Sequence, residues 1–323
     1  MKRVIRVAAT LLVTSLAVAY ILSKIDLGKT AHIIGSASVP WLVVSAVLTL
    51  ATTPLLGWRW QLLLRARGIR DSVAWLTRAY FVSYAFSQVL PTSVGGDAWR
   101  IFETSRRHPG NATPVTGSVL LERALGGAVT LALAGVGLLL AIGRYPVGAY
   151  LWLEVLSVVG MVAVGFVFFS RTIRSRLTFL LPYARRFRIE RPARAVYDGL
   201  HGYRDHPGTL LEVALISAVG QLMRIAAIYA AGRAVGIHLS LLPYSVLGPL
   251  LFLVMLVPFT VNGIGVREAF FVDFLGKLHV NADLAFACGF LFFVMTILLA
   301  LPGVVVLLWE NVFGRAPVAD GTA

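Results

Sequence analysis

Apolar runs long enough to cross a lipid bilayer recur along most of this chain. A transmembrane helix needs about 20 consecutive, mainly apolar residues. Hydrophobic residues make up 58% of the 323 positions and charged residues only 14%, a composition that excludes an ordinary soluble domain. The sequence therefore predicts an all-α, polytopic membrane protein in which residues 1–323 form a single integral membrane domain. The predicted full crossings lie near residues 4–22, 39–56, 115–142, 150–169, 209–231 and 284–309.

Two further apolar segments are interrupted by the same motif. The stretches PTSVGGDAWR (91–100) and PFTVNGIGVR (258–267) align without a gap as P-x-[ST]-V-x-G-x-x-x-R. Proline ends a helix, and glycine permits a tight turn close to another backbone. Irregular backbone is tolerated within a bilayer only where it is buried in protein or lines a cavity. We expect each segment to form a re-entrant, broken helical hairpin; the alternative is a segment that crosses the membrane fully.

The distribution of arginines predicts the topology. Cytoplasmic loops carry an excess of Lys and Arg, which places the basic loop 170–206 in the cytoplasm, and both chain termini with it. Residues 1–142 and 150–310 then contain the same order of crossings and hairpin in opposite orientations. This arrangement is an inverted-topology repeat, the plan of many secondary transporters.

The strongly basic composition has two explanations. A formal net charge of +14 would suit a nucleic-acid-binding protein, but the arginines gather in loop 170–206, where topology and contact with anionic lipids explain them better. Lys2, Arg3 and Arg6 precede the first apolar run, which suits a cleaved signal peptide or a retained helix; the repeat favours the retained helix. We expect a multi-pass protein of the plasma membrane that does not bind nucleic acid.

Ionisable residues within apolar segments define the candidate site, because charge inside a membrane is costly and usually faces a cavity or a partner. A helix that restarts after each motif would point N–H groups at the break and attract an anion. We assign the arginines of the site to a lipid phosphate, and its acidic residues to an amine or a proton. The candidate substrate-binding residues are Pro91, Ser93, Gly95, Gly96, Asp97, Arg100, Glu122, Arg123, Arg224, Pro258, Thr260, Gly263, Gly265, Arg267 and Glu268.

Each of these features also has a purely structural explanation. A motif can be a helix kink whose arginine extends to the membrane surface, and Glu122 can pair with Arg100 to hold the bundle together. The presence of two copies in opposed halves favours a functional role. We attribute Arg59 and Arg78, which lie near the predicted membrane surface, to topology alone.

The sequence contains no catalytic motif. It lacks a D-x-D pair for a nucleotide sugar, a P-loop, a dinucleotide fingerprint and a G-x-S-x-G elbow, and its histidines lack metal-ligand spacing. The single cysteine, Cys288, excludes an internal disulfide. We therefore expect a protein that is not an enzyme and that holds neither a metal nor a cofactor.

The motifs together resemble a known membrane family. At P-x-S-x-G-G-D-x-x-R (91–100), the pair Glu122-Arg123 and P-x-x-x-x-G-x-G-V-R-E (258–268), the chain is similar to the flippase-like family named after the transmembrane region of lysylphosphatidylglycerol synthase. The likeness covers nearly the whole chain; Asn262 stands where glycine is expected. In bifunctional members this region moves aminoacylated phosphatidylglycerol between leaflets, and a separate soluble domain performs aminoacyl transfer.

The resemblance implies a lipid flippase without the soluble synthase domain. Its substrate would be an anionic or zwitterionic lipid, either an aminoacyl-phospholipid or a glycan linked to a polyprenyl phosphate. The alternatives are a non-transporting membrane partner of a glycosyltransferase or lipid-modifying enzyme, and an intramembrane lipid transferase. Besides the lipid substrate, we consider as partners the anionic lipids at the basic loop, a second copy of the chain and a lipid-modifying enzyme.

Overall fold

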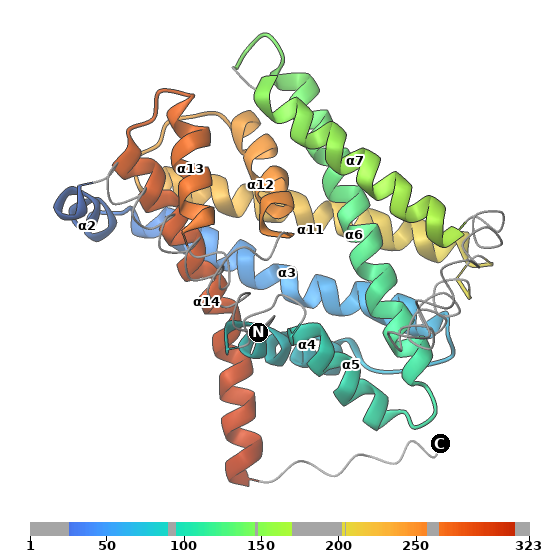
Figure 1. The fold of residues 1–323 in the computed structure, drawn as a ribbon. Coiled ribbons are helices and arrows are strands. Elements are labelled where there is room, and N and C mark those ends of the chain that lie inside the picture. Colours follow the sequence, from blue (N-terminus) through green and yellow to red (C-terminus); the bar gives the residue numbers. More distant parts are fainter. Residues whose placement is uncertain are drawn as a thin grey trace, which may run out of the picture.

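The described part of the chain contains helices and no strand (Figure 1). The computed structural model describes residues 26–89, 95–145, 148–169, 202–203, 205–256 and 265–313. The helices are α2 (Leu27–Gly35), α3 (Val39–Arg65), α4 (Val73–Val89), α5 (Gly95–Arg107), α6 (Ala112–Ala141), α7 (Gly148–Phe169), α11 (Pro207–Ala234), α12 (Leu241–Leu256), α13 (Val266–Gly276) and α14 (Ala282–Phe313).

Four helices are long and apolar enough to cross a membrane: α3, α6, α11 and α14. They coincide with four of the predicted crossings, and α7 lies at a fifth. The predicted first crossing, near residues 4–22, lies outside the described residues, as does nearly all of the basic loop 170–206. The prediction of a helical, multi-pass membrane protein is thus confirmed at this level.

Helix α2 lies where the sequence suggests only a short loop between the first two crossings. The helix begins directly after Asp26, whose carboxylate accepts hydrogen bonds from the backbone N–H groups of Gly28 (2.9 Å) and Lys29 (3.1 Å). A side-chain cap of this kind satisfies N–H groups that a helix start leaves free. The capping aspartate therefore explains the added helix.

Helix α3 continues to Arg65 instead of ending near residue 56. Its last turns carry polar side chains that find partners inside the protein. The indole N–H of Trp60 donates to Ser118 of α6 (2.9 Å), and the Gln61 amide donates to the carbonyl of Asp71 (2.7 Å). Because these partners replace water, the helix can continue past the end of its purely apolar segment.

Helices α3 and α11 run side by side through the centre of the bundle (Figure 1). Ser45 of α3 donates a hydrogen bond to the carbonyl of Ala227 in α11 (2.9 Å). The packing around this pair repeats: α4 packs on α3 and α14, and α12 packs on α11 and α6. The helices that lead into the two motifs therefore have equivalent neighbours in the two halves of the chain.

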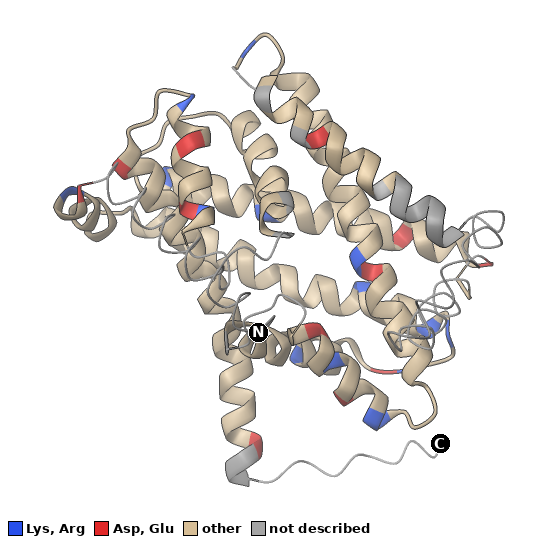
Figure 2. Ribbon diagram, viewed as in Figure 1, with Lys and Arg blue, Asp and Glu red and all other residues tan. Residues whose placement is uncertain are grey.

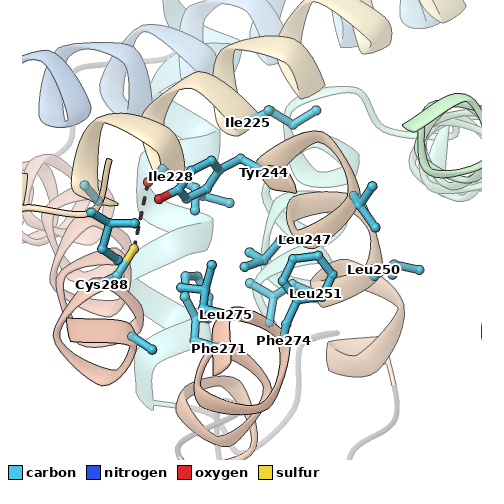
Figure 3. Packing of buried hydrophobic residues seen from close by; sticks show 14 of the residues in the cluster. Ile225, Ile228, Tyr244, Leu247, Leu250, Leu251, Phe271, Phe274, Leu275 and Cys288 are labelled. Atoms are coloured by element: carbon cyan, nitrogen blue, oxygen red, sulfur yellow. Dashed lines mark hydrogen bonds between the residues drawn. The ribbon is translucent and has the colours of Figure 1, made fainter. Parts of the chain in front are cut away.

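The largest core cluster of the described residues fixes α12 and α13 against α11 and α14. Figure 3 shows Leu247 and Leu251 of α12 facing Phe271 and Leu275 of α13, with Cys288 of α14 beside α11. Close packing of this kind matters in a membrane, where lipid is as apolar as the side chains and the hydrophobic effect gives helices little reason to associate.

Helices α4 and α5 form an antiparallel hairpin. Helix α4 ends at Val89 and α5 begins at Gly95, and the first residues of the first motif lie between them, outside the described residues. Asp71, just before α4, binds Nε of Arg107 and Nε2 of His108 at the end of α5, both at 2.8 Å. The start of α4 and the end of α5 therefore lie together, and we call these three residues the first clasp.

Helix α12 ends at Leu256 and α13 begins at Val266, on either side of most of the second motif, and their outer ends lie near the turn between α6 and α7. Tyr145 Oη in that turn lies 3.4 Å from Ser240 Oγ, which precedes α12. Tyr150 donates a hydrogen bond to Asp273 near the end of α13 (2.8 Å), and Lys277 binds both (2.8 Å to Asp273). Helix α6, with 30 residues, is about 45 Å long and links the first clasp to this turn. The two hairpins therefore open at opposite ends of α6.

Candidate functional site

A cavity of about 310 Å³ lies where α3, α4, α5, α6, α11 and α12 meet. Its wall combines charged, polar and small side chains within a bundle of mainly apolar helices. Figure 2 shows adjacent basic and acidic positions on α6, which is otherwise uncharged. The lining residues are Thr52, Leu56, Arg59, Tyr80, Ser83, Tyr84, Ser87, Asp97, Arg100, Glu122, Arg123, Gly126, Gly127, Thr130, Ser217, Gly220, Gln221, Arg224 and Phe252.

Glu122 of α6 is the centre of the charge network in this cavity. Its side chain is 1% exposed and accepts hydrogen bonds from Arg100 of α5 (Nη1 to Oε2, 2.8 Å), Arg59 of α3 and Tyr80 of α4. A carboxylate is stable in an apolar bundle only when it is paired and hydrogen-bonded. Glu122 therefore ties α6 to three other helices, and the structural alternative of a Glu122–Arg100 pair is part of the site.

Arg100 binds two carboxylates and packs against two aromatic rings. Its Nε and Nη2 each lie 2.9 Å from Asp97 Oδ1, while Nη1 binds Glu122. Its guanidinium carbon lies 4.8 Å from the ring centroid of Trp60 and 4.5 Å from that of Tyr80. The planar fork of arginine can make these contacts at once, whereas the compact ammonium of lysine cannot.

The first turn of α5 reaches the cavity because α5 lies very close to α4. A β-carbon added at Gly96 would collide with Ser83 and Ser87 of α4. The glycine thus permits a helix approach that any side chain would prevent. At the next position Asp97 faces the cavity, where it also pairs with Arg123 of α6, whose side chain is 43% exposed.

Arg224 of α11 enters the same cavity with no carboxylate partner among the described residues. Its polar contact there is with Oε1 of Gln221, at 3.4 Å. Two further buried donors in the wall, Nε of Arg59 and Nε2 of Gln221, lack an acceptor in the described part of the chain. Buried donors in folded proteins almost always have an acceptor. The wall therefore presents both positive charge and unused N–H groups to the cavity.

The charges of the wall favour an anion. Its described residues include four arginines and two carboxylates, which gives a formal charge of +2. Excess charge inside a membrane protein is costly unless a counter-ion is near. A phosphate matches both this charge and the bidentate donors of arginine. Within the described residues, no group of three or more His, Cys, Asp or Glu side chains could hold a metal.

The second motif has a different construction. Gly265 adopts φ +86°, a left-handed conformation that favours glycine, directly before α13. Glu268 accepts a hydrogen bond from the Gly265 N–H (2.8 Å) and binds its neighbour Arg267 (Nε to Oε1, 2.9 Å). Arg267 is 2% exposed and packs over the ring of Phe293, 4.5 Å from its centroid. These three motif residues lie outside the wall of the cavity.

The structure thus brings together one part of the predicted site. The predicted residues that line the cavity are Asp97, Arg100, Glu122, Arg123 and Arg224. Of the others, Gly95 begins α5, Gly96 supports it, and Gly265, Arg267 and Glu268 lie apart at the start of α13. The remaining predicted residues, Pro91, Ser93, Pro258, Thr260 and Gly263, lie outside the described residues.

Arg59 is a correction to the sequence interpretation, which attributed it to topology. Its side chain is 11% exposed, binds Glu122 and donates to Ser217 of α11 (Nη1 to Oγ, 2.9 Å). The error follows from ending the second crossing too early, because the longer α3 places Arg59 inside the bundle. Arg78 lies outside the cavity wall and binds Glu103 (2.8 Å) and Glu310 (2.9 Å).

A polar face of α4 was also missed. Tyr80, Ser83, Tyr84 and Ser87 all line the cavity. Their spacing of three and four residues places them on one face of a helix. This spacing is legible in the sequence, so a search for polar residues at helical period within apolar segments would have found the face.

Comparison with known proteins is consistent with these observations. A segment of 105 residues is 32% identical to "Glycosyltransferase AglD" of Haloferax volcanii; it covers 32% of this chain and 17% of the length of that protein. The family described as "Lysylphosphatidylglycerol synthase TM region" matches residues 7–303, which include both motifs and every helix that lines the cavity. The resemblance predicted from the motifs is thereby confirmed, and the chain belongs to the family of the lysylphosphatidylglycerol synthase transmembrane region.

Proposed function

We propose that this protein is a lipid flippase that moves a phosphate-bearing lipid between the leaflets of the plasma membrane. The observation that carries the proposal is the cavity wall, whose formal charge of +2 lies within a bundle of membrane-spanning helices. The cavity holds the head group of the lipid, while the acyl or polyprenyl chains stay in the surrounding membrane.

The head group is recognised through its phosphate. Arg224 supplies a charge that no carboxylate among the described residues neutralises, and Gln221 Nε2 and Arg59 Nε supply buried donors. Phosphate oxygens accept hydrogen bonds from guanidinium and amide N–H groups alike, which explains donors that lack an acceptor among the described residues. The carboxylates of Asp97 and Glu122 are already paired with arginines. They set the positions of those arginines rather than binding an amine.

Movement between leaflets requires access to the cavity from both sides of the membrane. The arrangement of the two hairpins supports access of this kind. The α4–α5 and α12–α13 hairpins open at opposite ends of α6, and α4 and α12 have equivalent neighbours. We infer that both are re-entrant hairpins in two inverted-topology repeats, residues 1–142 and 150–310. Rocking of one repeat against the other would open the cavity to each leaflet in turn. The basic loop 170–206 and both termini would then face the cytoplasm.

Two classes of phosphate-bearing lipid are candidates for the substrate. The family name favours an aminoacyl-phospholipid, and the partial likeness to a glycosyltransferase favours a glycan linked to a polyprenyl phosphate. That likeness also supports the second candidate function, a non-transporting membrane partner of a glycosyltransferase. Native mass spectrometry of lipids that co-purify with the protein would identify the class.

The experiment that tests the proposal is a leaflet assay in proteoliposomes. Vesicles would contain fluorescent phosphatidylglycerol or a fluorescent polyprenyl phosphate, and an added reductant would quench only the outer leaflet. We expect Arg224→Gln to weaken apparent lipid affinity roughly 10-fold or more, because a hydrogen bond to a charged group contributes about 1.5–3 kcal/mol. Arg233→Gln is the matched control, since Arg233 lies on the same helix but outside the cavity, beside His238.

Three results would contradict the flippase. Wild-type protein that leaves both lipids in their original leaflet would favour the partner protein. A chemically altered lipid after incubation with membrane extract would favour an intramembrane transferase. Equal transport by Arg224→Gln and wild type would show that the lipid head group does not bind in this cavity.

A further inference from the structure

A second, apolar groove of about 560 Å³ lies between α6 and α7 and contains one acidic side chain, Glu154. The other described residues of its wall are Ala, Gly, Leu and Val. Glu154 is only 7% exposed, and neither of its carboxyl oxygens has a hydrogen-bond partner among the described residues. It faces Gly135 of α6, where an added β-carbon would lie 3.6 Å from Oε1. In Figure 2, α7 carries an acidic position with no basic position beside it.

Helices α6, α12 and, at Tyr150, α13 contact α7, and no described charge on them lines the groove of Glu154. On α6, Glu122 and Arg123 lie about 18 Å or more from Gly135 along the helix axis, and both belong to the other cavity. On α12 the titratable side chain is Tyr244, which packs on Tyr229 of α11.

The remaining titratable groups nearby are at the beginning of α7. Tyr150, one helical turn before Glu154, is occupied by Asp273 and Lys277, and Arg144 and Tyr145 lie in the turn between α6 and α7. None of these groups lines the groove.

An ionised carboxylate in such surroundings would be both buried and unpaired. Transfer of an isolated charge into an apolar environment is so unfavourable that the group takes up a proton and becomes neutral instead. We propose that Glu154 is a proton-binding site and that it couples the lipid movement proposed above to a proton gradient, an inference that rests on that function. The carboxylates of the cavity, Asp97 and Glu122, are each paired with two arginines and so lack the unpaired surroundings of Glu154.

Helix α6 connects the two sites. Its Thr130 lines the lipid cavity, and the adjacent residue Leu131 lines the groove of Glu154. Loss of the proton would place a charge against the bare backbone at Gly135 and would favour a rearrangement of α7 on α6. Because α6 also carries Glu122 and Arg123, such a rearrangement would reach the lipid cavity.

The first test is labelling of the whole protein in vesicles with dicyclohexylcarbodiimide, followed by mass spectrometry of its peptides. This reagent adds to protonated carboxyl groups in apolar surroundings and leaves a stable acylurea. We expect an adduct at Glu154 whose yield falls as the pH is raised from mildly acidic to alkaline, and none at Glu122, which serves as an internal control. Glu154→Gln should abolish this adduct, and Glu154→Asp should retain it. Absence of an adduct at Glu154 at every pH, or a yield that does not change with pH, would overturn the proton site.

The second test uses the leaflet assay with a pH gradient imposed across the vesicle membrane. We expect the gradient to accelerate lipid movement by wild type and to have no effect on Glu154→Gln. Wild-type movement that ignores the gradient, together with a labelled Glu154, would overturn the coupling alone. If wild type moved no lipid at all, the proposed function would fail, and the labelling result would still decide whether Glu154 binds a proton.

Discussion

The two copies of the motif have the same sequence pattern but different surroundings. Arg100 of the first copy binds Glu122, which comes from another helix, and faces a cavity. Arg267 of the second copy binds Glu268, its neighbour in sequence, and packs over Phe293 outside that cavity. The comparison teaches that a repeated motif can separate two helices in both halves while placing an arginine in the cavity wall in only one of them.

The largest difference should appear between Glu122→Gln and Glu268→Gln. Glu122 is the buried partner of two arginines and a tyrosine, so its neutralisation leaves Arg59 without a carboxylate and Arg100 with Asp97 alone. Removal of one partner of a buried pair typically costs about 3–5 kcal/mol. We expect Glu122→Gln to lower the free energy of unfolding in detergent by that amount and to abolish lipid movement.

Glu268→Gln should cost less, because it affects one arginine and keeps an oxygen for the Gly265 N–H. Equal losses of stability for the two variants would show that the two motifs are energetically equivalent and would contradict the difference proposed between them.

The next effect distinguishes the two arginines themselves. Arg100→Lys removes the fork that reaches Asp97 and Glu122 together, and we expect a loss of about 1.5–3 kcal/mol, the contribution of a hydrogen bond between charged groups. Arg267→Lys keeps a cation beside Glu268 and should cost about 1 kcal/mol. The measurement is thermal unfolding combined with the leaflet assay. A larger transport defect in Arg267→Lys than in Arg100→Lys would mean that the second motif also contacts the lipid.

The sequence predicted the helices better than the asymmetry between the motifs. Apolar runs indicated the four long apolar helices α3, α6, α11 and α14, and the two motif prolines indicated where α4 and α12 end. Intramembrane charge indicated five residues that line the cavity, Asp97, Arg100, Glu122, Arg123 and Arg224. These are local properties of the chain. The partner of a buried arginine depends instead on how distant helices pack, which the pattern of one segment does not contain. For the same reason Arg59 was missed, since α3 continues only because other helices satisfy its polar side chains.

Glycine substitutions should show that the two motifs require glycine for different reasons. Gly96 is required for space, so Gly96→Ala should cost about 1–3 kcal/mol through overpacking, and the larger Gly96→Asn should cost more. Gly265 is required for its φ of +86° and ψ of −48°, which lie outside the left-handed region that asparagine tolerates, so Gly265→Ala and Gly265→Asn should cost about the same.

Thermal unfolding of the four variants gives the order directly. Gly160→Ala in α7 is the control and should be neutral or slightly stabilising, since nothing lies within 4 Å of an added β-carbon there. A cost that rises from Ala to Asn at Gly265 as strongly as at Gly96 would refute the distinction between space and backbone conformation.

The smallest effects concern the outer ends of the hairpins. In the first clasp the Asp71 side chain is 1% exposed and binds Arg107 and His108, so Asp71→Asn should cost about 1–2 kcal/mol. The pair of Asp273 with Lys277 is 48% and 39% exposed, so Asp273→Asn should cost no more than about 0.5 kcal/mol and should lose even that at high salt. Unfolding at low and high ionic strength compares the two.

If the loss of stability in Asp71→Asn fell at high salt, or if Asp273→Asn lost more stability than Asp71→Asn, the α12–α13 hairpin would be the more firmly held of the two. The expected result has a functional consequence. The α4–α5 hairpin, with a buried clasp and a buried arginine network, would be the fixed wall of the cavity. The Asp273–Lys277 pair at the outer end of the α12–α13 hairpin is more exposed than the first clasp, so we expect a rocking movement that opens the cavity to begin there.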